Sequence, residues 1–256
     1  MNTKGLIFDF GFTLFYFKDV SIEKYFDCFK RGLQKSVKLL KNSNILKDDS
    51  ILIKKFIKTF QKTRLDFFRK SVKTKNEFPT TYIFQNVLRI ILGEEPISKL
   101  TEEFYIELAD LYHSCEEEEW IPFNQTKDTL NKILELKNIK IGILSNHPNH
   151  TTIKNLLNKY DLLKFFDTVV TSAKFGKRKP NPEIFHYTLK RMGLENEEGS
   201  SVLMVGDEYA DVIGAKRAGL QTVLFERGYK FPFEKEIEVQ NLRKTNNIIE
   251  ILDFIQ

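Results

Sequence analysis

The sequence predicts an α/β fold in which a doubly wound parallel sheet carries an all-helical insertion. Three observations predict this class. A short apolar run, Leu6 to Phe8, lies near the N-terminus, and only helical periodicity is seen from about Val20 to Glu119. After Pro122, helical segments alternate with short β-rich apolar runs. Such alternation is typical of parallel strands joined by right-handed crossover helices.

The first strand, Lys4 to Phe8, has the continuous apolar character of a strand that is buried on both faces of a parallel sheet. It ends on Asp9. A charge at the end of a buried strand is unfavourable unless it is paired or bound to a metal. In open α/β sheets, ligands bind at the carboxyl ends of the strands. From these residues alone, Asp9 is either a structural turn residue or the centre of an active site.

The long helical segment predicts a small bundle, because apolar residues recur at spacings of three and four and so share one face of each helix. The four series are Phe26, Phe29, Leu33, Val37 and Leu40; Ile53, Phe56, Ile57 and Phe60, resuming at Leu65 and Phe68; Tyr82, Phe84, Val87, Leu88 and Ile91; and Leu100, Phe104, Leu108 and Leu111. The acidic run from Glu116 to Glu119 is expected to be an exposed helix end, and His113 a surface or packing residue.

The rest of the chain predicts the remaining strands and helices of the sheet core. Strands are expected over Ile139–Leu144, Thr168–Thr171, Val202–Val205 and Gln221–Phe225, and helices over Thr126–Leu136, Thr151–Leu157, from Asn181, from about Ala210 to Gly219, and over Ile248–Ile255. Asn181 and Pro182 suit an N-cap and a first helical position. The expected domains are therefore a core of residues 1–15 and 120–256 and a helical insertion of residues 16–119.

Composition excludes several classes of protein. The 256 residues are 41% hydrophobic and 29% charged, as in a globular domain, and no apolar run is long enough to span a membrane. The net charge of +5 is scattered along the chain, so we expect no nucleic-acid partner. Two cysteines, Cys28 and Cys115, are too few for a disulfide framework and favour a reduced, cytoplasmic setting. The oligomeric state is left open.

Polar residues follow the predicted strands at points that a parallel sheet brings to one edge. They are Asp9 and Thr13, Ser145 and Asn146, Lys179, and Asp207 and Asp211. A carboxylate can act as the nucleophile in phosphoryl transfer, and a hydroxyl and a lysine can hold the phosphoryl oxygens. Oxygen ligands suit Mg²⁺, and no cluster of His and Cys indicates zinc. These residue types therefore predict phosphoryl transfer with Mg²⁺.

The ordered set of motifs resembles that of the haloacid dehalogenase (HAD) superfamily of hydrolases. The stretch from Asp9 to Thr13 resembles its first motif, normally Asp-x-Asp-x-Thr, and Ser145 after an apolar strand resembles the second. Lys179-Pro180-Asn181-Pro182 resembles the third motif, and Gly206-Asp207 with Asp211 the fourth. The resemblance implies a Rossmann-like HAD core, a helical cap inserted after the first motif, and hydrolysis of a small phosphorylated metabolite.

The resemblance also implies roles around the metal and the nucleophile. Asp9 would attack phosphorus, form an aspartyl-phosphate and bind Mg²⁺. The backbone carbonyl of Gly11 and the carboxylate of Asp207 would be further ligands. Asp211 would support the metal site directly or through water.

On the substrate side, the resemblance assigns the phosphoryl group to the second and third motifs. Ser145 and the Asn146 amide would bind phosphoryl oxygens. Lys179 would pair with both Asp9 and the phosphate, and Thr13 is placed with the substrate-binding group. Asp9, Lys179 and Ser145 form the predicted catalytic set, and a small phosphorylated molecule is the predicted partner.

Gly11 is where this chain departs from the resemblance. Most phosphatases of the superfamily resemble Asp-x-Asp, and the second aspartate serves as general acid and base, which contributes a factor of about 10² to 10⁴. Glu208 is a candidate replacement. Three alternatives stay open: a phosphatase with reduced or rerouted acid–base chemistry, a relative that acts as a phosphonate hydrolase or dehalogenase, and a non-enzymatic binding protein on the same fold.

Overall fold

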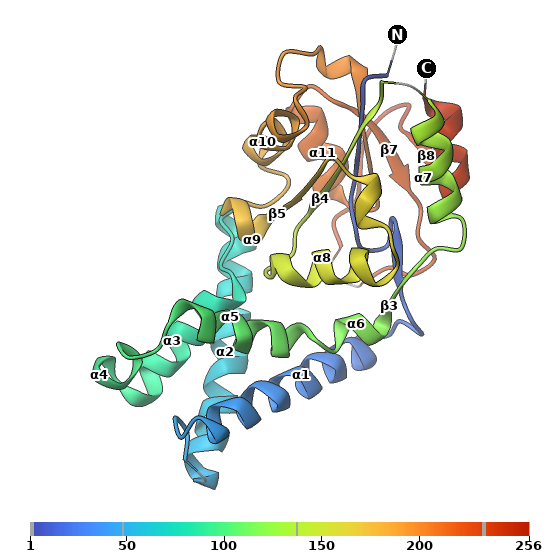
Figure 1. Ribbon diagram of the computed structural model, residues 1–256. Helices are drawn as coiled ribbons and strands as arrows, with labels where there is room; N and C mark the ends of the chain where they lie inside the picture. The colour runs from blue at the N-terminus through green and yellow to red at the C-terminus, as the bar shows by residue number, and fades with distance from the viewer. Residues whose placement is uncertain (1–2, 48, 137, 232–233, 256) are drawn as a thin grey trace. The chain divides into compact units, whose positions relative to one another are not determined.

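The computed structural model describes residues 3–47, 49–136, 138–231 and 234–255. The chain forms two compact units, Met1–Val20 with Trp120–Gln256, and Ser21–Glu119. The first is built on a parallel sheet and the second on helices (Figure 1). The predicted α/β class with an all-helical insertion is confirmed. The ends of the expected core, residues 1, 2 and 256, lie outside the described residues.

The sheet of the α/β unit has six strands in the order β5-β4-β1-β6-β7-β8, and every neighbouring pair is parallel. The strands are β1 (Gly5–Phe8), β4 (Lys140–Ser145), β5 (Thr168–Thr171), β6 (Val202–Gly206), β7 (Gln221–Phe225) and β8 (Arg243–Thr245). All four residues of β1 are buried, as its continuous apolar run predicts. The chain adds β4 and β5 on one side of β1 and β6 to β8 on the other. The carboxyl end of β1 therefore lies at a topological switch point, where such sheets bind ligands.

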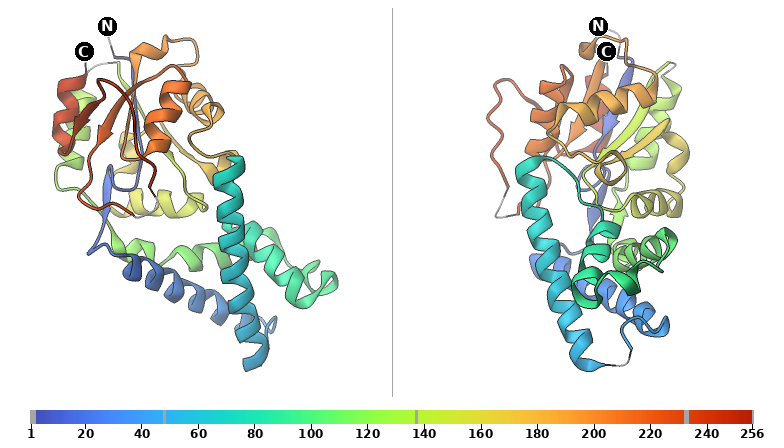
Figure 2. Two further views of the ribbon diagram at one scale, coloured as in Figure 1. Left: turned by 180° about the vertical axis from the view of Figure 1, so that it is seen from behind. Right: turned by 90° about the vertical axis from the view of Figure 1, so that its left-hand side faces the viewer.

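Helices cover both faces of this sheet (Figures 1 and 2). They are α7 (Thr126–Glu135), α8 (His150–Lys159), α9 (Ser172–Phe175), α10 (Pro182–Met192) and α11 (Tyr209–Arg217), with 3₁₀ turns η1 (Leu163–Phe165), η2 (Gly199–Ser201) and η3 (Ile248–Phe254). On α10, Phe185 and Leu189 pack with Ile7 and Leu144 of the sheet in one hydrophobic cluster. The predicted N-cap of α10 is present, because the Asn181 side chain accepts a hydrogen bond from the α10 backbone. The closing segment is a 3₁₀ helix, not the expected α-helix.

A two-stranded antiparallel ribbon marks the two places where the chain crosses between the units. Strand β2 (Phe15–Phe17) pairs with β3 (Trp120–Pro122). Phe15, Phe17 and Trp120 are buried, so the ribbon belongs to the α/β unit, and that unit extends to Val20. Three-residue strands are too short to give a periodic signal. The predicted boundary between the core and the helical insertion therefore lies at residue 15, and the pairing of β2 with β3 was not predicted.

The helical unit has a single apolar core formed by the faces that the sequence predicts. Its helices are α1 (Ile22–Asn42), α2 (Ser50–Thr74), α3 (Thr80–Leu92), α4 (Glu94–Ile97), α5 (Glu102–His113) and α6 (Glu116–Glu119). Half of the residues in the predicted stripes are buried and others are partly buried, but Phe26, Leu65, Phe68 and Tyr82 are 40–58% exposed. Among the described residues, no helix is both long and apolar enough to span a membrane.

The acidic run at α6 was predicted to be an exposed helix end, which is wrong for Glu116 and Glu119, whereas Glu118 is exposed. Glu116 and Glu119 are 2% and 7% exposed. Oε1 of Glu116 lies 2.5 Å from Nδ1 of His113, whose Nε2 lies 2.7 Å from the Thr80 hydroxyl. Glu119 forms an ion pair of 2.6 Å with Arg31. Each of these two buried carboxylates has a partner, which offsets the unfavourable free energy of burying its charge. His113 is a packing residue.

The expectation of reduced, unpaired cysteines was also wrong. Cys28 on α1 and Cys115, just after α5, form a disulfide inside the helical unit. Both side chains are buried. The two residues are 87 positions apart in sequence, so their proximity depends on the packing of α1 against α5, and a count of cysteines cannot reveal it. The argument for a reducing compartment therefore loses its premise.

We predict that removing this disulfide destabilises the helical unit. The double variant Cys28→Ser, Cys115→Ser should lose about 2–5 kcal/mol of unfolding free energy, because the crosslink restricts the unfolded chain. Urea unfolding followed by far-UV circular dichroism measures the loss. Dithiothreitol should lower the urea midpoint of the natural protein and leave the double variant unchanged. Equal stability of the oxidised natural protein and the variant would contradict the prediction.

Candidate active site

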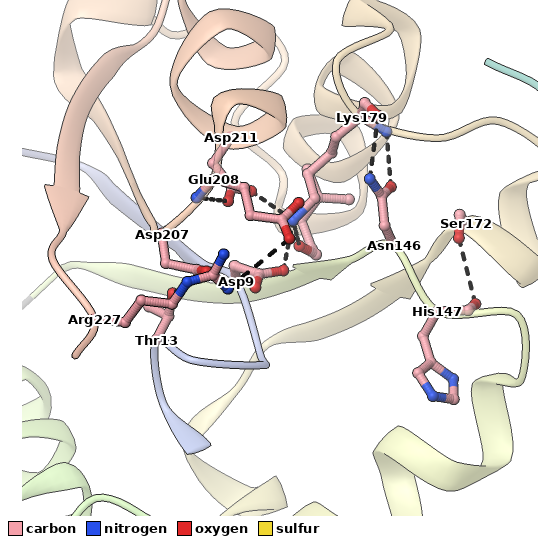
Figure 3. A network of polar contacts seen from close by, with 11 residues as sticks. Asp9, Thr13, Asn146, His147, Ser172, Lys179, Asp207, Glu208, Asp211 and Arg227 are labelled. Atoms are coloured by element: carbon pink, nitrogen blue, oxygen red, sulfur yellow. Dashed lines mark hydrogen bonds and ion pairs between the residues drawn. The ribbon is translucent and has the colours of Figure 1, made fainter. Parts of the chain in front are cut away.

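Four predicted side chains meet at the carboxyl end of the sheet (Figure 3). Asp9 follows β1, Lys179 lies between α9 and α10, Asp207 follows β6, and Asp211 is in the first turn of α11. All four are buried. Asp9 and Asp207 directly follow neighbouring strands, and because Phe8 is in register with Val205 the two residues are offset by only one position. The parallel register thus brings together residues almost 200 positions apart.

Lys179 links two of the carboxylates. Its Nζ lies 2.5 Å from Oδ1 of Asp9 and 2.6 Å from Oδ1 of Asp211, and it donates a hydrogen bond of 2.7 Å to the carbonyl of Leu144. Burial alone would lower the pKa of Lys179, but the charges of Asp211 and Asp9 outweigh it and raise that pKa. The ammonium therefore stays protonated, with hydrogen bonds to Asp9 and Leu144 and an ion pair with Asp211.

Asn146 positions Lys179 through its side chain. The amide nitrogen of Lys179 donates to Oδ1 of Asn146 at 2.8 Å, and Nδ2 of Asn146 donates to the Lys179 carbonyl at 3.1 Å. Ser145, the last residue of β4, is buried next to Leu144, whose carbonyl receives the Lys179 hydrogen bond. The second and third motifs are therefore joined directly. This side-chain link could not be predicted from local sequence, because it joins residues 33 positions apart.

Asp207 is held from two sides. The hydroxyl of Thr13 donates to its Oδ1 at 3.2 Å, and Nη1 of Arg227 lies 2.5 Å from its Oδ2. Thr13 is fully buried, so its hydroxyl positions Asp207. Arg227 is not among the predicted site residues, although it follows the end of β7 by two residues. Its position after a strand of the parallel sheet is the same signal that predicted Asp9 and Asp207.

The site holds more carboxylates than cations. Burial raises the pKa of Asp9 against the opposing charge of Lys179. Burial and the negative charges of Glu208 and Asp9 hold the pKa of Asp207 well above its usual range. Burial also raises the pKa of Asp211 to about 6, again against Lys179. These shifts share one cause, because water no longer solvates the carboxylates. A bound divalent cation would relieve that cost.

The carboxylates fit a divalent cation that prefers oxygen. Asp9, Asp207 and Asp211 each offer an oxygen, and the three oxygens lie within 4.8 Å of one another. Oδ2 of Asp207 and Oδ1 of Asp211 are buried and have no hydrogen-bond partner among the residues that the structure describes. Each of these two oxygens instead forms an ion pair, Oδ1 of Asp211 with Lys179 and Oδ2 of Asp207 with Arg227. An all-oxygen set suits Mg²⁺ and not a structural zinc ion.

A side chain at residue 11 would crowd the indole of Trp120. A Cβ placed on Gly11 would lie 3.0 Å from Cη2 of Trp120. Trp120 is 7% exposed, and its ring centroid lies 5.0 Å from that of Phe12 and 5.3 Å from that of Phe17. The left-handed residue in this turn is Phe12, with φ 58°, and not Gly11. The obstacle to an aspartate at residue 11 is therefore the indole, and not the backbone conformation.

Glu208 lies at the exposed side of the cluster. Its side chain is 51% exposed, and its Oε1 lies 4.0 Å from Nη1 of Arg227. Its backbone amide donates to Oδ2 of Asp211 at 3.1 Å in a capping box that begins α11. The capping box fixes the backbone of Glu208 beside Asp207 and leaves its carboxylate in contact with solvent.

A family model described as haloacid dehalogenase-like hydrolase matches residues 43–225. The match covers well over half of the chain and includes the second, third and fourth motifs. It begins after the first motif, so the identification does not depend on Asp9 or on the unusual Gly11.

Two phosphatases illustrate the similarity in sequence. A glyceraldehyde 3-phosphate phosphatase of Methanocaldococcus jannaschii is 31% identical over 175 residues, which cover 66% of this chain and 71% of that protein. A phosphoglycolate phosphatase of Aquifex aeolicus is 31% identical over 132 residues, which cover 52% of this chain and 59% of that protein. The second alignment thus spans less than two thirds of its relative.

Solved structures show the same fold over nearly the whole chain. A 2-haloacid dehalogenase from Pseudomonas syringae pv. Tomato DC3000 superposes with a TM-score of 0.66 at 16% identity and covers 98% of this chain and 97% of that one. A HAD phosphatase from Thermococcus onnurineus superposes with a TM-score of 0.58 at 23% identity, with the same coverage. The HAD-hydrolase YfnB from Bacillus subtilis, bound to magnesium, gives 0.54 at 18% identity and covers 100% and 99%. At these identities the likeness concerns the fold alone.

We predict that Lys179→Met strongly destabilises the protein at neutral pH. The variant leaves Asp9 and Asp211 buried without their shared cation, which should cost about 3–5 kcal/mol of unfolding free energy. Because the folded pKa values of these carboxylates are raised, the difference from the natural protein should shrink as the pH falls to about 5 and the carboxylates become protonated. Urea unfolding at both pH values measures the difference.

Lys177→Met is the matched control for that prediction. Lys177 pairs with Glu183 at 2.5 Å, but the two side chains are 35% and 56% exposed. Exposed ion pairs contribute about 0–1 kcal/mol, so this variant should be nearly as stable as the natural protein. Equal losses for the two variants would contradict the structural role of the buried Lys179.

Proposed function

The chain belongs to the haloacid dehalogenase-like hydrolase family, and on that premise we propose that it is a Mg²⁺-dependent phosphatase of a small phosphorylated metabolite. The observation that carries the proposal is the buried cluster of Asp9, Asp207 and Asp211, in which Lys179 contacts two of the three carboxylates. Phosphoryl transfer requires a nucleophile, cations and hydrogen-bond donors at one point, and this edge of the sheet supplies them.

Asp9 is the proposed nucleophile. One of its oxygens would bond to phosphorus as the bond from phosphorus to the ester oxygen breaks, which gives an aspartyl-phosphate that water then hydrolyses. Lys179 keeps Asp9 next to a positive charge and so favours its ionised form. Asp9, Asp207, Asp211 and the carbonyl of Gly11 would hold Mg²⁺, which offsets the charge of the phosphoryl oxygens when bound.

Ser145, the backbone amide of Asn146 and Lys179 are proposed to bind the phosphoryl oxygens. All three lie at the carboxyl ends of strands or in the loops that follow. Thr13 acts indirectly, because its buried hydroxyl is bonded to Asp207. The relatives named above act, by name, on glyceraldehyde 3-phosphate and phosphoglycolate, which supports a small phosphate ester as the substrate. The helical unit is proposed to act as a cap.

A dehalogenase-like reaction is the second candidate, and Gly11 is the observation that favours it. A halide leaves as a stable anion and needs no acid, so a site without a carboxylate at residue 11 loses nothing in that reaction. The three-carboxylate cluster speaks for the phosphatase, because displacement of halide by Asp9 does not require two further buried carboxylates beside it.

We predict that hydrolysis of small phosphate monoesters requires Mg²⁺ and that Asp207→Asn lowers kcat/KM at least about 100-fold. The rate should fall because the variant removes an anionic ligand and leaves a weaker, neutral one. A screen of phosphate monoesters, with 2-haloacids and phosphonates in parallel, measures the reaction class. Asp161→Asn is the control, since Asp161 is an exposed residue of the same unit, with a side chain 61% exposed. Full activity in excess chelator would overturn the metal requirement.

We further predict that the rate depends steeply on the leaving group. If residue 11 cannot protonate the ester oxygen, aryl and acyl phosphates should react much faster than alkyl phosphates, and slow hydrolysis of the aspartyl-phosphate should give a burst of product. A leaving-group series under stopped flow measures both effects. A flat dependence without a burst would show that another residue donates the proton, and Glu208→Gln would then identify it.

Trp120 decides whether a carboxylate can be restored in that experiment. Gly11→Asp alone should not accelerate alkyl phosphates, because its Cβ would meet the far end of the indole ring. The double variant Gly11→Asp, Trp120→Phe shortens that ring and should raise the alkyl phosphate rate at least about tenfold. Trp120→Phe alone is the control and should leave the leaving-group dependence steep.

A further inference from the structure

Arg227 is the buried cation at this edge of the sheet that the proposed chemistry does not use. Its side chain is 5% exposed. The guanidinium lies 4.8 Å from the ring centroid of Phe12 and 5.6 Å from that of Phe231. It reaches Asp207 through Nη1, at 2.5 Å from Oδ2, and Glu234 through Nη2. Figure 3 shows it beside Asp207 on the side opposite Lys179.

The contact between Arg227 and Asp207 is an attraction of charges without hydrogen-bond geometry. Within the described part of the chain, Nε, Nη1 and Nη2 of Arg227 are buried and make no hydrogen bond, and neither does Oδ2 of Asp207. A buried guanidinium gains most from paired, well-aligned hydrogen bonds. This guanidinium has the charge of its partner without that alignment, so the pair is held by charge alone.

Two other carboxylates lie near the guanidinium of Arg227. Oε1 of Glu234 contacts Nη2, and Oε1 of Glu208 lies 4.0 Å from Nη1. Oδ1, the other carboxylate oxygen of Asp207, accepts a hydrogen bond from the Thr13 hydroxyl. Asp207 therefore keeps its orientation if the guanidinium moves toward Glu234, and Arg227 keeps a counter-charge. The network can exist with Arg227 paired to Asp207 or released from it.

We propose that Arg227 is an internal competitor for the divalent cation at Asp207. In the metal-free protein, its charge compensates a carboxylate that would otherwise be buried without a partner. A divalent ion bound to the same carboxylate repels the guanidinium, so binding must drive Arg227 toward Glu234 and the affinity for metal is lowered. Arg227 is thus a positioning residue that sets metal affinity. The inference rests on the metal site of the proposed function.

Calorimetric titration with Mn²⁺ alone, without substrate, tests this inference. Arg227→Gln should bind Mn²⁺ at least fivefold more tightly than the natural protein, because the competing charge is gone. Arg227→Lys retains the charge and should stay within twofold. Lys230→Gln removes the same charge from an exposed residue of the same loop and should also stay within twofold. Equal or weaker binding by Arg227→Gln would overturn the inference, since loss of a merely structural residue does not tighten metal binding.

A second variant tests the competition from the other side, including the case in which Arg227→Gln does not fold. Glu234→Gln removes the alternative partner and should weaken Mn²⁺ binding at least threefold. Glu226→Gln removes an exposed carboxylate paired with Lys244 and should have a smaller effect. Equal effects of these two variants would overturn the inference.

The outcomes also separate this inference from the proposed function. If no protein binds Mn²⁺, the metal site fails and the inference fails with it. If the Arg227 and Glu234 variants bind Mn²⁺ as tightly as the natural protein, and Asp207→Asn does not bind it, the role of Arg227 fails and the proposed metal site stands.

Discussion

The ion pairs of Lys179 with Asp9 and Asp211 are the interaction on which the active-site edge depends. Asp9 ends the central strand β1, Asp211 begins α11 beyond β6, and Lys179 arrives from the opposite side after β5. The ammonium therefore ties together the segments on both sides of the switch point. Without it, two buried carboxylates would lack a counter-charge, which is among the most unfavourable states that a protein interior can contain.

Gly206, the glycine of the fourth motif, leaves the space in which the Asp211 side chain reaches Lys179. A Cβ on Gly206 would lie 2.3 Å from the carboxyl carbon of Asp211. The Asp211 side chain therefore packs directly on the backbone of β6, where one oxygen caps α11 and the other meets Lys179. This close approach requires a residue without a side chain at position 206.

The sequence predicted the parts of the fold and site that follow from local pattern or from parallel topology. The buried character of β1 is readable from its apolar run, and parallel topology then brings Asp9 and Asp207 to one edge. The disulfide between Cys28 and Cys115, the burial of Glu116 and the hold of Asn146 on Lys179 were not predictable, since each joins residues whose proximity depends on tertiary packing. Arg227 was predictable but overlooked, because arginine two residues after a strand resembles an ordinary surface residue.

The absence of a carboxylate at residue 11 and the presence of Arg227 at Asp207 act in the same electrostatic direction. Both make the potential around Asp9 more positive than it would be with an aspartate at residue 11 and no guanidinium nearby. In the proposed reaction, a more positive potential would favour the ionised form of Asp9 and attract a doubly charged phosphoryl group. It would do nothing to deliver a proton to the leaving oxygen. The residues around Asp9 are therefore better suited to the proposed binding and attack than to the proton transfers that would complete the proposed reaction.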